Sequence, residues 1–245
     1  MNETRKLQRR HSSVRRYEDR PVGEELLREL IACGQAASSS SFVQAYSLVR
    51  VTDREKRQLI AEAAGGQRWV TEAPEFLVVC ADLKRLEYAI EKSDAGKLEG
   101  WTEHFMVATV DAALMAQNLM LAAESEGLGG VFIGGIRNNP QTVADCLELP
   151  ALVYPVFGLC LGWPAERNEV KPRLPVDAVL HENRYDADRI PADVDAYDER
   201  MSRYYAERSQ AAKQTDWSRQ SAAALQGKKR EHMLAFLHGR GFLNI

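Results

Sequence analysis

Cysteine is scarce in this sequence, with four among 245 residues, and no two of them form a C-x-x-C pair. They are far apart and lie in apolar stretches, at Cys33, Cys80, Cys146 and Cys160. This spacing fits neither a zinc site nor the disulfide framework of a small secreted domain. We therefore expect reduced thiols in the core of an intracellular protein.

The sequence also lacks an excess of positive charge and a long apolar run. Lysine and arginine number 32 against 35 aspartates and glutamates, which gives a net charge of -3, whereas a dedicated nucleic-acid binder usually carries a basic excess. The longest uncharged run, residues 30–49, contains five serines and two glutamines and is not expected to span a bilayer. No apolar signal core follows the polar N-terminal residues. We expect a cytoplasmic protein with neither a nucleic-acid nor a membrane partner.

Motifs of hydrolases, metal sites and dinucleotide-binding folds are missing. The sequence contains neither G-x-S-x-G nor H-E-x-x-H. Its five histidines are scattered, at His11, His104, His181, His232 and His238. The glycines from Gly127 to Gly135 do not follow G-x-G-x-x-G, because Phe132 occupies the sixth position, and they come after a predicted helix instead of a strand. We expect no metal site and no Rossmann nucleotide site.

Apolar residues make up 45% of the chain and charged residues 27%, which is enough to fill a core and to hydrate a surface. Hydrophobic periodicity predicts a mixture of helices and strands. Helices are expected over residues 21–37, 53–64, 193–214 and 228–238, with a short one from Pro140, and strands over residues 46–52, 75–81 and 154–162. No internal repeat is present, so the pattern predicts a single α+β domain with a trailing arm.

The segment from Trp101 to Glu126 is a long helical pattern with few charges. Apolar side chains occupy nearly all of its circumference, so that little of it is polar. A helix of this kind is expected either at the centre of the fold or against another subunit.

Three short segments are candidates for chemistry. His11-Ser12-Ser13-Val14-Arg15 combines hydroxyl groups with an arginine, and Lys171-Pro172-Arg173 spaces two cations rigidly. Both kinds of cation suit phosphate. Gly134 and Gly135 would let a flat ligand approach the backbone closely. Taken alone, each cationic segment also fits a solvated surface cluster, and the glycine pair also fits a plain turn.

Taken together, these segments resemble the FMN-dependent nitroreductase family, in particular its oxygen-insensitive NADPH nitroreductase and flavin reductase branch. The motifs that carry the resemblance occur in the expected order: His11-Ser-Ser-Val-Arg15, Ala37-Ser-Ser-Ser-Ser-Phe42-Val-Gln44, Gly65-Gly-Gln67, Ala122-Ala-Glu-Ser-Glu-Gly-Leu-Gly-Gly130, Phe132-Ile-Gly-Gly-Ile-Arg-Asn-Asn139, Phe157-Gly-Leu-Cys-Leu-Gly-Trp-Pro164, Lys171-Pro-Arg-Leu-Pro175 and His181-Glu-Asn183. The first motif departs from the branch, which usually has arginine where this sequence has Ser12.

The resemblance implies an α+β, nitroreductase-like fold in which helices wrap a central antiparallel-rich sheet. It also implies an intertwined homodimer with two FMN sites at the subunit interface. Residues 1–183 would form the FMN-binding core. Residues 184–245 would form an extended helical C-terminal arm of the same domain, packed on the partner subunit. The apolar helix at residues 101–126 would then be an interface helix.

The resemblance assigns roles to residues by their position in these motifs. The cofactor-binding residues would be His11, Ser12, Ser13, Arg15, Gln67, Phe132, Ile133, Gly134, Gly135, Lys171 and Arg173. Among them the three cations would hold the FMN phosphate, the glutamine would bond the polar edge of the flavin ring, and the backbone of residues 132–135 would face the ring. Ser41 would line the substrate side, and Arg208 and Arg230 would receive the NADPH phosphate or the acceptor.

The activity that the resemblance implies is an NADPH-dependent FMN oxidoreductase. NADPH would reduce bound FMN, and a nitroaromatic, a quinone or a related small molecule would then take two electrons in a ping-pong sequence. The flavin carries the hydride in such a reaction, so no catalytic side chain is expected. Two alternatives stay open: an NAD(P)H:FMN reductase that supplies free reduced flavin, and a flavin-binding module without turnover.

Overall fold

The computed structural model describes residues 1–208, 213–227 and 229–245. The chain forms two compact units, of which the first comprises Met1–Asn168 and Arg230–Ile245 and the second comprises Glu169–Lys229. The polypeptide therefore leaves the first unit after Asn168 and returns to it at Arg230. The division into a core and an arm between residues 183 and 184 stays a prediction.

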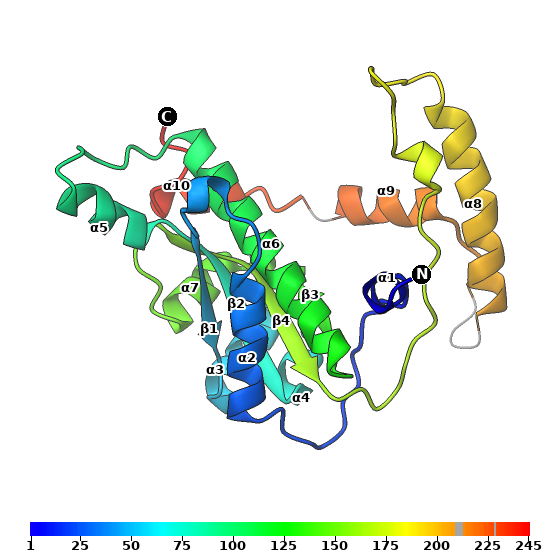
Figure 1. Cartoon of the computed structure of the whole chain (residues 1–245), viewed down its shortest axis with the longest axis horizontal. Coiled ribbons are helices and arrows are strands. Elements are labelled where there is room, and N and C mark those ends of the chain that lie inside the picture. Colours follow the sequence, from blue (N-terminus) through cyan, green and yellow to red (C-terminus); the bar gives the residue numbers. More distant parts are fainter. Residues whose placement is uncertain (209–212, 228) are drawn as a thin grey trace. The chain divides into compact units, whose positions relative to one another are not determined.

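A four-stranded sheet forms the centre of the first unit (Figure 1). Its strands are β1 (Tyr46–Arg50), β2 (Glu75–Asp82), β3 (Gly129–Ile133) and β4 (Val153–Gly162), arranged in the order β1-β2-β4-β3. All three pairings are antiparallel, which confirms the predicted antiparallel-rich sheet. The strand expected over residues 46–52 ends earlier, at Arg50. Every residue of β2 is buried, as its continuous apolar run predicts for a strand covered on both faces.

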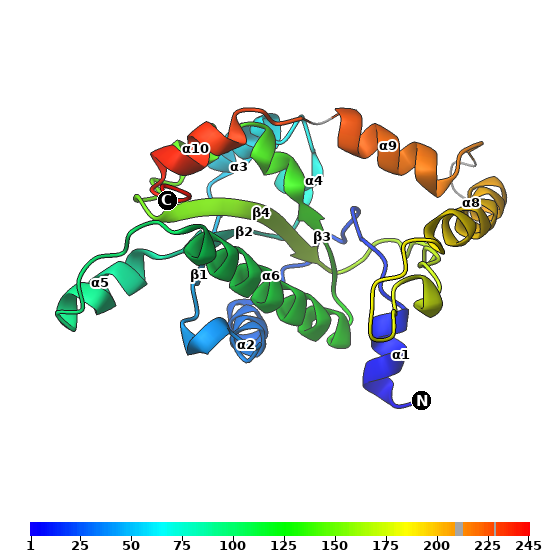
Figure 2. The ribbon, with the colours of Figure 1, turned by 90° about the horizontal axis from the view of Figure 1, so that it is seen from above.

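Helices cover both faces of this sheet (Figure 2). On one side lie α2 (Glu24–Gln35) and α6 (Thr102–Ser125), and the other side carries α3 (Arg54–Ala63), α7 (Pro140–Cys146) and α10 (Met233–Gly239). Side chains of β2 alternate between two core clusters. Leu77 packs in the cluster that contains Met115 of α6, whereas Phe76 packs in the cluster that contains Ile60 of α3. The sheet is thus the middle layer of the unit.

Local signals explain where two of these helices begin. The side chain of Asp53 accepts hydrogen bonds from the backbone N–H groups of Glu55 and Lys56, which caps α3 at the predicted position. The expectation that Pro21 opens the next helix upstream is wrong, because α2 begins only at Glu24. Gly23 has a φ of 85°, a left-handed conformation that separates the proline from the helix.

Four helices were not predicted from the sequence. They are α1 (Glu3–Arg9), α4 (Trp69–Glu72), α5 (Lys84–Lys92) and α9 (Trp217–Gly227). Neither α1, α5 nor α9 has a buried residue, and α4 is a single turn. The single turn of α4 is too short for a periodic signal, whereas α5 does carry an apolar stripe, with Leu86 and Ile90 one turn apart, that was not recognised.

The second unit contains η3 (Val176–Ala178), α8 (Ile190–Glu207) and α9. Its core consists of Tyr197, Met201 and Tyr205, which lie on one face of α8. The helix predicted over residues 193–214 ends instead at Glu207, because Arg208 is extended, with a ψ of 134°. Residues 209–212 of that prediction lie outside the described residues.

The C-terminal segment closes the first unit. The helix predicted over residues 228–238 corresponds to α10, which begins only at Met233, and residue 228 lies outside the described residues. Phe242 is 1% exposed and packs edge-on against Phe105 and Tyr154, with ring centroids 6.3 and 5.0 Å away. The backbone N–H of Asn244 donates to the carbonyl oxygen of Gly100 at 3.0 Å. These contacts fix the end of the chain against the start of α6.

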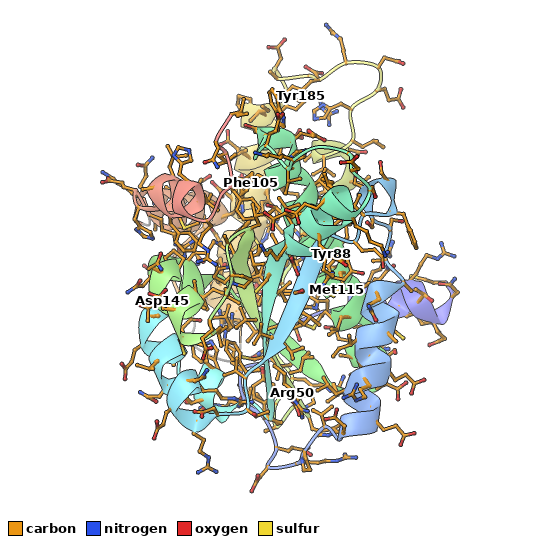
Figure 3. The ribbon with its side chains drawn as sticks, turned by 90° about the vertical axis from the view of Figure 1, so that its left-hand side faces the viewer. Arg50, Tyr88, Phe105, Met115, Asp145 and Tyr185 are labelled. Atoms are coloured by element: carbon orange, nitrogen blue, oxygen red, sulfur yellow. The ribbon has the colours of Figure 1, made fainter. Side chains whose placement is uncertain are left out.

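Helix α6 has a buried face and an exposed apolar stripe. Ala112 and Met115 are fully buried against the sheet, which confirms the predicted central position. Figure 3 labels Phe105 and Met115 on this helix and Arg50 toward the lower end of the sheet. Among the described residues, α6 is the one helix whose length and composition would allow it to cross a membrane. Its packing on the sheet and on α2 accounts for the apolar residues of its buried face.

The cysteines occupy different environments. Cys80 and Cys160 are buried in the strands, as predicted, but Cys33 is exposed and Cys146 is half-buried, so the expectation of four core thiols is wrong for these two. Cys33 lines a surface pocket together with residues of α1 and α6, among them Leu7 and Asn118.

Candidate functional site

The segment from His11 to Arg15 runs beside the edge strand β3. The backbone N–H of Val14 donates to the carbonyl oxygen of Gly130 at 2.9 Å. A Cβ atom at Gly129 would lie 2.5 Å from the Val14 side chain, so glycine is required for this close approach. The backbone contact places Ser12, Ser13 and Arg15 at the edge of the sheet.

Two groups of this segment already have partners within the chain. The ring Nδ1 of His11 lies 2.6 Å from Oε1 of Glu124 at the end of α6. The carbonyl oxygen of Ser13 accepts a hydrogen bond from the side chain of Asn168 at 2.8 Å. His11 is therefore an anchor between the segment and α6, and its predicted contact with the cofactor stays a prediction.

Arg15 is exposed and its guanidinium carbon lies 5.6 Å from the ring centroid of Trp69. No carboxylate among the described residues lies within ion-pair distance of it, in contrast to Arg50, which is paired with Glu75 at 2.6 Å. The aromatic ring lies beside the guanidinium, and within the described ranges no group accepts a hydrogen bond from its side-chain N–H donors. Such a group is suited to binding an anion.

Gln67 and Gly135 are in direct contact. The Gln67 side chain donates from Nε2 to the carbonyl oxygen of Ala64 at 2.9 Å and accepts from the indole N–H of Trp69 at 3.0 Å. A Cβ atom at Gly135 would lie 2.1 Å from Nε2 of Gln67 and 2.5 Å from the oxygen of Ala64. The structure thus brings together two residues that the resemblance assigned to the same ring, and it explains glycine at position 135 by close packing.

The predicted ring-facing segment ends β3 and continues into η2 (Gly134–Asn138). Phe132 packs edge-on against Phe157 with centroids 5.1 Å apart, and Ile133 is 1% exposed. Arg137 lies under the turn, where it donates to the carbonyl oxygen of Val156 at 2.5 Å. Burial lowers the pKa of Arg137, and the Arg230 guanidinium lowers it further.

Arg230 contacts the same turn from the returning C-terminal segment. Its guanidinium donates to the carbonyl oxygen of Gly134 at 3.0 Å and to the side-chain oxygen of Asn138 at 3.0 and 3.1 Å. The ring Nε2 of His232 lies 3.0 Å from the carbonyl oxygen of Arg137. The structure therefore places Arg230 on the turn that the resemblance assigned to the flavin, and its role toward NADPH or an acceptor stays a prediction.

Ser41 lies in η1 (Ser40–Phe42), in a loop with unusual backbone geometry. Ser41, Phe42 and Gln44 have φ values of 46°, 59° and 52°, which residues other than glycine rarely adopt. Ser41 and Phe42 are both exposed, and the side chain of Phe42 is 80% exposed. The buried carboxylate of Asp111 on α6 accepts hydrogen bonds from this loop.

Asp111 was missed at the level of the sequence, although a signal was available. It is the one charged side chain of α6 between His104 and Glu124, inside a stretch that is otherwise apolar or neutral. A single acid on a buried helical face has to find donors within the fold.

The remaining predicted residues belong to the second unit. The ammonium group of Lys171 lies 5.6 Å from the ring centroid of Tyr205, and the hydroxyl of Tyr197 donates to the carbonyl oxygen of Pro172 at 2.8 Å. These contacts fix the segment up to Arg173 on α8. Arg208 follows the last turn of α8, and its backbone N–H donates to the carbonyl oxygen of Tyr204 at 3.0 Å.

Neither Lys171 nor Arg173 has a carboxylate within ion-pair distance in the described part of the chain, and the same holds for Arg15. Three cations without a carboxylate partner are the donor set that a group with close to two negative charges requires. Arg15 belongs to the first unit and the other two belong to the second, so their joint contact with one phosphate stays a prediction.

Comparisons with known proteins agree over the whole chain. The model of the nitroreductase family matches residues 7–163, and the model described as the C-terminal domain of the nitroreductase family matches residues 171–244. A Cr(VI) reductase of Pseudomonas sp. (strain G-1) is 43% identical over 244 residues, which are 97% of this chain and 98% of that protein. The NADPH-flavin oxidoreductase of Vibrio harveyi is 43% identical over 241 residues, which are 98% of each.

A solved structure extends the likeness to three dimensions. Nitroreductase A from Vibrio parahaemolyticus superimposes with a TM-score of 0.90 at 44% sequence identity and covers 100% of both chains. The similarity therefore includes the sheet, the helices around it and the second unit.

Proposed function

This chain belongs to the nitroreductase family, and from that premise we propose that it is an NADPH-dependent FMN oxidoreductase acting on nitroaromatics, quinones or related small molecules. The observation that carries the proposal is the similarity to flavin-dependent oxidoreductases along the whole chain. The unpaired cations and the close glycine turn support it independently, because they offer what a flavin phosphate and a flat ring require.

The residues that would hold FMN are those with free donors. Arg15, Lys171 and Arg173 would bind the phosphate, and the hydroxyls of Ser12 and Ser13 would lie near it. Gln67 is already oriented by Ala64 and Trp69, and it keeps a second N–H donor and a second lone pair for the polar edge of the ring. The absence of side chains at Gly134 and Gly135 would allow the ring to approach the backbone.

When bound, FMN supplies the hydride chemistry. The chain binds and orients the reactants, and its positive groups would favour the anionic reduced form of the cofactor. NADPH and the acceptor would use the same open side in turn, next to Ser41. This arrangement predicts ping-pong kinetics and requires neither a protein nucleophile nor a metal ion.

The exposed stripe on α6 supports a homodimer. Met106, Val110 and Leu114 follow one another at helical spacing and are 53%, 53% and 45% exposed. A continuous apolar row of this kind on a long helix is typical of a surface that another subunit covers. We place the protein in the cytoplasm as a homodimer without nucleic-acid or membrane partners.

The purified protein tests this function directly. We expect a yellow preparation that oxidises NADPH when menadione or nitrofurazone is added, with parallel double-reciprocal plots. A colourless protein that does not bind added FMN would overturn the proposal. A yellow protein without turnover would instead support the flavin-binding module.

A second activity at the same site is the reduction of FMN that is then released. The Vibrio harveyi relative, named as an NADPH-flavin oxidoreductase, favours this candidate. Dialysis separates the two: FMN that remains bound acts as a prosthetic group, whereas FMN that is lost and restores activity on addition acts as a substrate.

A further inference from the structure

A single buried carboxylate closes the loop that carries Ser41. Asp111 lies on α6 and is 1% exposed. Its Oδ2 accepts from the hydroxyl of Ser39 at 2.8 Å and from the backbone N–H of Ala45 at 3.1 Å, and its Oδ1 accepts from the backbone N–H of Ser40 at 2.9 Å. The carboxylate therefore joins both ends of the loop.

The loop between these ends is strained. Ser41, Phe42 and Gln44 all have left-handed backbone conformations, which persist only where the surroundings determine them. The exposed Phe42 ring contributes no core packing that could do so. The hydroxyl of Ser39 accepts a hydrogen bond from the backbone N–H of Gln44 at 2.7 Å, and it donates a hydrogen bond to Asp111. Hydrogen bonds that start at Asp111 thus hold the strained residues.

We propose that Asp111 is a positioning residue for acceptor binding, an inference that rests on the proposed function. It does not touch the acceptor. It fixes the loop of residues 39–45 so that Ser41 faces the site where the acceptor binds. All three groups of this loop that contact Asp111 donate hydrogen bonds. A carboxylate accepts hydrogen bonds at both oxygens, whereas the amide of asparagine, which has the same size, accepts at one end and donates at the other. This explains an acid in the middle of an apolar helix.

The test uses Asp111→Asn in the full-length protein. The amide keeps the shape of the side chain but presents an NH₂ group to at least one backbone or hydroxyl donor, which leaves that donor unpaired. We expect hydrogen exchange at the amides of Ser40 and Ala45 to accelerate about tenfold or more, as expected for the loss of a hydrogen bond to a charged group. We expect the KM for nitrofurazone to rise about 3- to 10-fold with a nearly unchanged kcat.

Glu75→Gln is the matched control. Glu75 is a second buried carboxylate, 5% exposed, which pairs with Arg50 on β1 and has no contact with the loop. We expect this variant to lose stability without a change in the KM for nitrofurazone. Asp111→Glu keeps the charge and is expected to recover part of the exchange protection.

Three results would overturn the inference. One is Asp111→Asn with unchanged exchange at Ser40 and Ala45, and another is an unchanged KM. The third is an equal rise in KM in Glu75→Gln, which would show that any loss of stability has this effect. If Asp111→Asn does not fold, Ser39→Ala removes one donor from the loop and is expected to shift exchange and KM in the same direction; no shift would again refute the role. A wild-type protein that reduces no acceptor refutes the proposed function instead, and the exchange measurement still reports whether Asp111 holds the loop.

Discussion

Individual side chains at the candidate site differ in whether the chain itself already occupies their hydrogen-bonding groups. His11 is paired with Glu124, and Arg230 donates to the turn at Gly134. Arg15 has an aromatic neighbour and no carboxylate within ion-pair distance in the described part of the chain. Sequence similarity assigned all three to ligand contacts. Their partners distinguish the residue with free donors from the two that also hold the fold together.

Glycine at position 135 is required by a close approach, and its replacement should be costly. In Gly135→Ala the new methyl group would overlap the Gln67 side chain and the oxygen of Ala64, which is expected to destabilise the protein by about 1–3 kcal/mol and to weaken FMN binding. Chemical unfolding and FMN titration measure the two effects. Gly134→Ala is the control for stability alone, because its methyl group would meet only the guanidinium of Arg137, at 3.2 Å. Equal losses of stability in both variants would contradict this explanation.

The preference for NADPH over NADH should depend on Arg208. Arginine binds a phosphate with charge-assisted hydrogen bonds worth about 1.5–3 kcal/mol, so Arg208→Ala is expected to lower the ratio of kcat/KM for the two coenzymes about tenfold or more. Arg203→Ala, which removes an exposed arginine from α8, the helix that precedes Arg208, should leave the ratio unchanged. If the preference survives in Arg208→Ala, another residue recognises the 2′-phosphate.

At the scale of secondary-structure elements, the sequence predicted those with a strong apolar pattern. The buried strand β2, the capped helix α3 and the long helix α6 all lie close to their expected positions. The helices α1, α5 and α9 were missed, and none of them buries a side chain, although Leu86 and Ile90 of α5 lie one turn apart and offered a periodic signal. The pattern also predicted an end for α8 at residue 214, whereas the helix ends at Glu207, since nothing in the sequence marks the extended backbone of Arg208.

The residues of the candidate site were assigned from motifs, whereas the contacts between them were not predicted. Motifs of a known family assigned Gln67 and Gly135 to the flavin ring, and that role stays a prediction. Gln67 and Gly135 lie so close together that a methyl group added at Gly135 would overlap the Gln67 side chain. This contact depends on how two separate loops pack. Asp111 was missed because its role comes from a loop that is distant in sequence, beginning at Ser39.

The buried thiol of Cys80 on strand β2 should make the stability of the protein decrease at alkaline pH. Burial raises the pKa of the Cys80 thiol from 9.0 to about 12. The unfolded chain therefore releases this proton at lower pH than the folded chain does, so the contribution of the neutral thiol is complete below pH 9 and is lost as the pH rises toward 12. We expect the free energy of unfolding to fall over this range, and to fall less steeply in Cys80→Ala.

Cys33→Ala is the control for this measurement, because Cys33 is exposed and its removal should leave the slope unchanged. Tyrosines that titrate in the same range are common to all three proteins and do not affect the comparison. An identical slope in wild type and Cys80→Ala, measured by urea unfolding at several pH values, would contradict the assignment.

At the scale of the whole molecule, the matches to the nitroreductase family extend over both compact units. The family model covers residues 7–163, and the model of the family's C-terminal domain covers residues 171–244. The predicted phosphate ligands are divided in the same way, since Arg15 lies in the first unit and Lys171 in the second. The predicted phosphate site therefore draws on motifs from both parts of the chain, and a joint contact of these residues with one phosphate stays a prediction.

The proposed homodimer would assemble through the exposed stripe of α6. Leu114→Lys places a charge in the middle of this stripe, and burying an unpaired charge in an interface is costly, so we expect the variant to elute as a monomer at a concentration where the wild type elutes as a dimer. Leu59→Lys is the matched control, because Leu59 is 48% exposed on α3 and Leu114 is 45% exposed. If FMN binds at the interface, the monomer should also lose the cofactor, which its absorbance spectrum reports. A Leu114→Lys protein that remains dimeric would mean that the subunits meet through another surface, and the stripe would then need a different explanation.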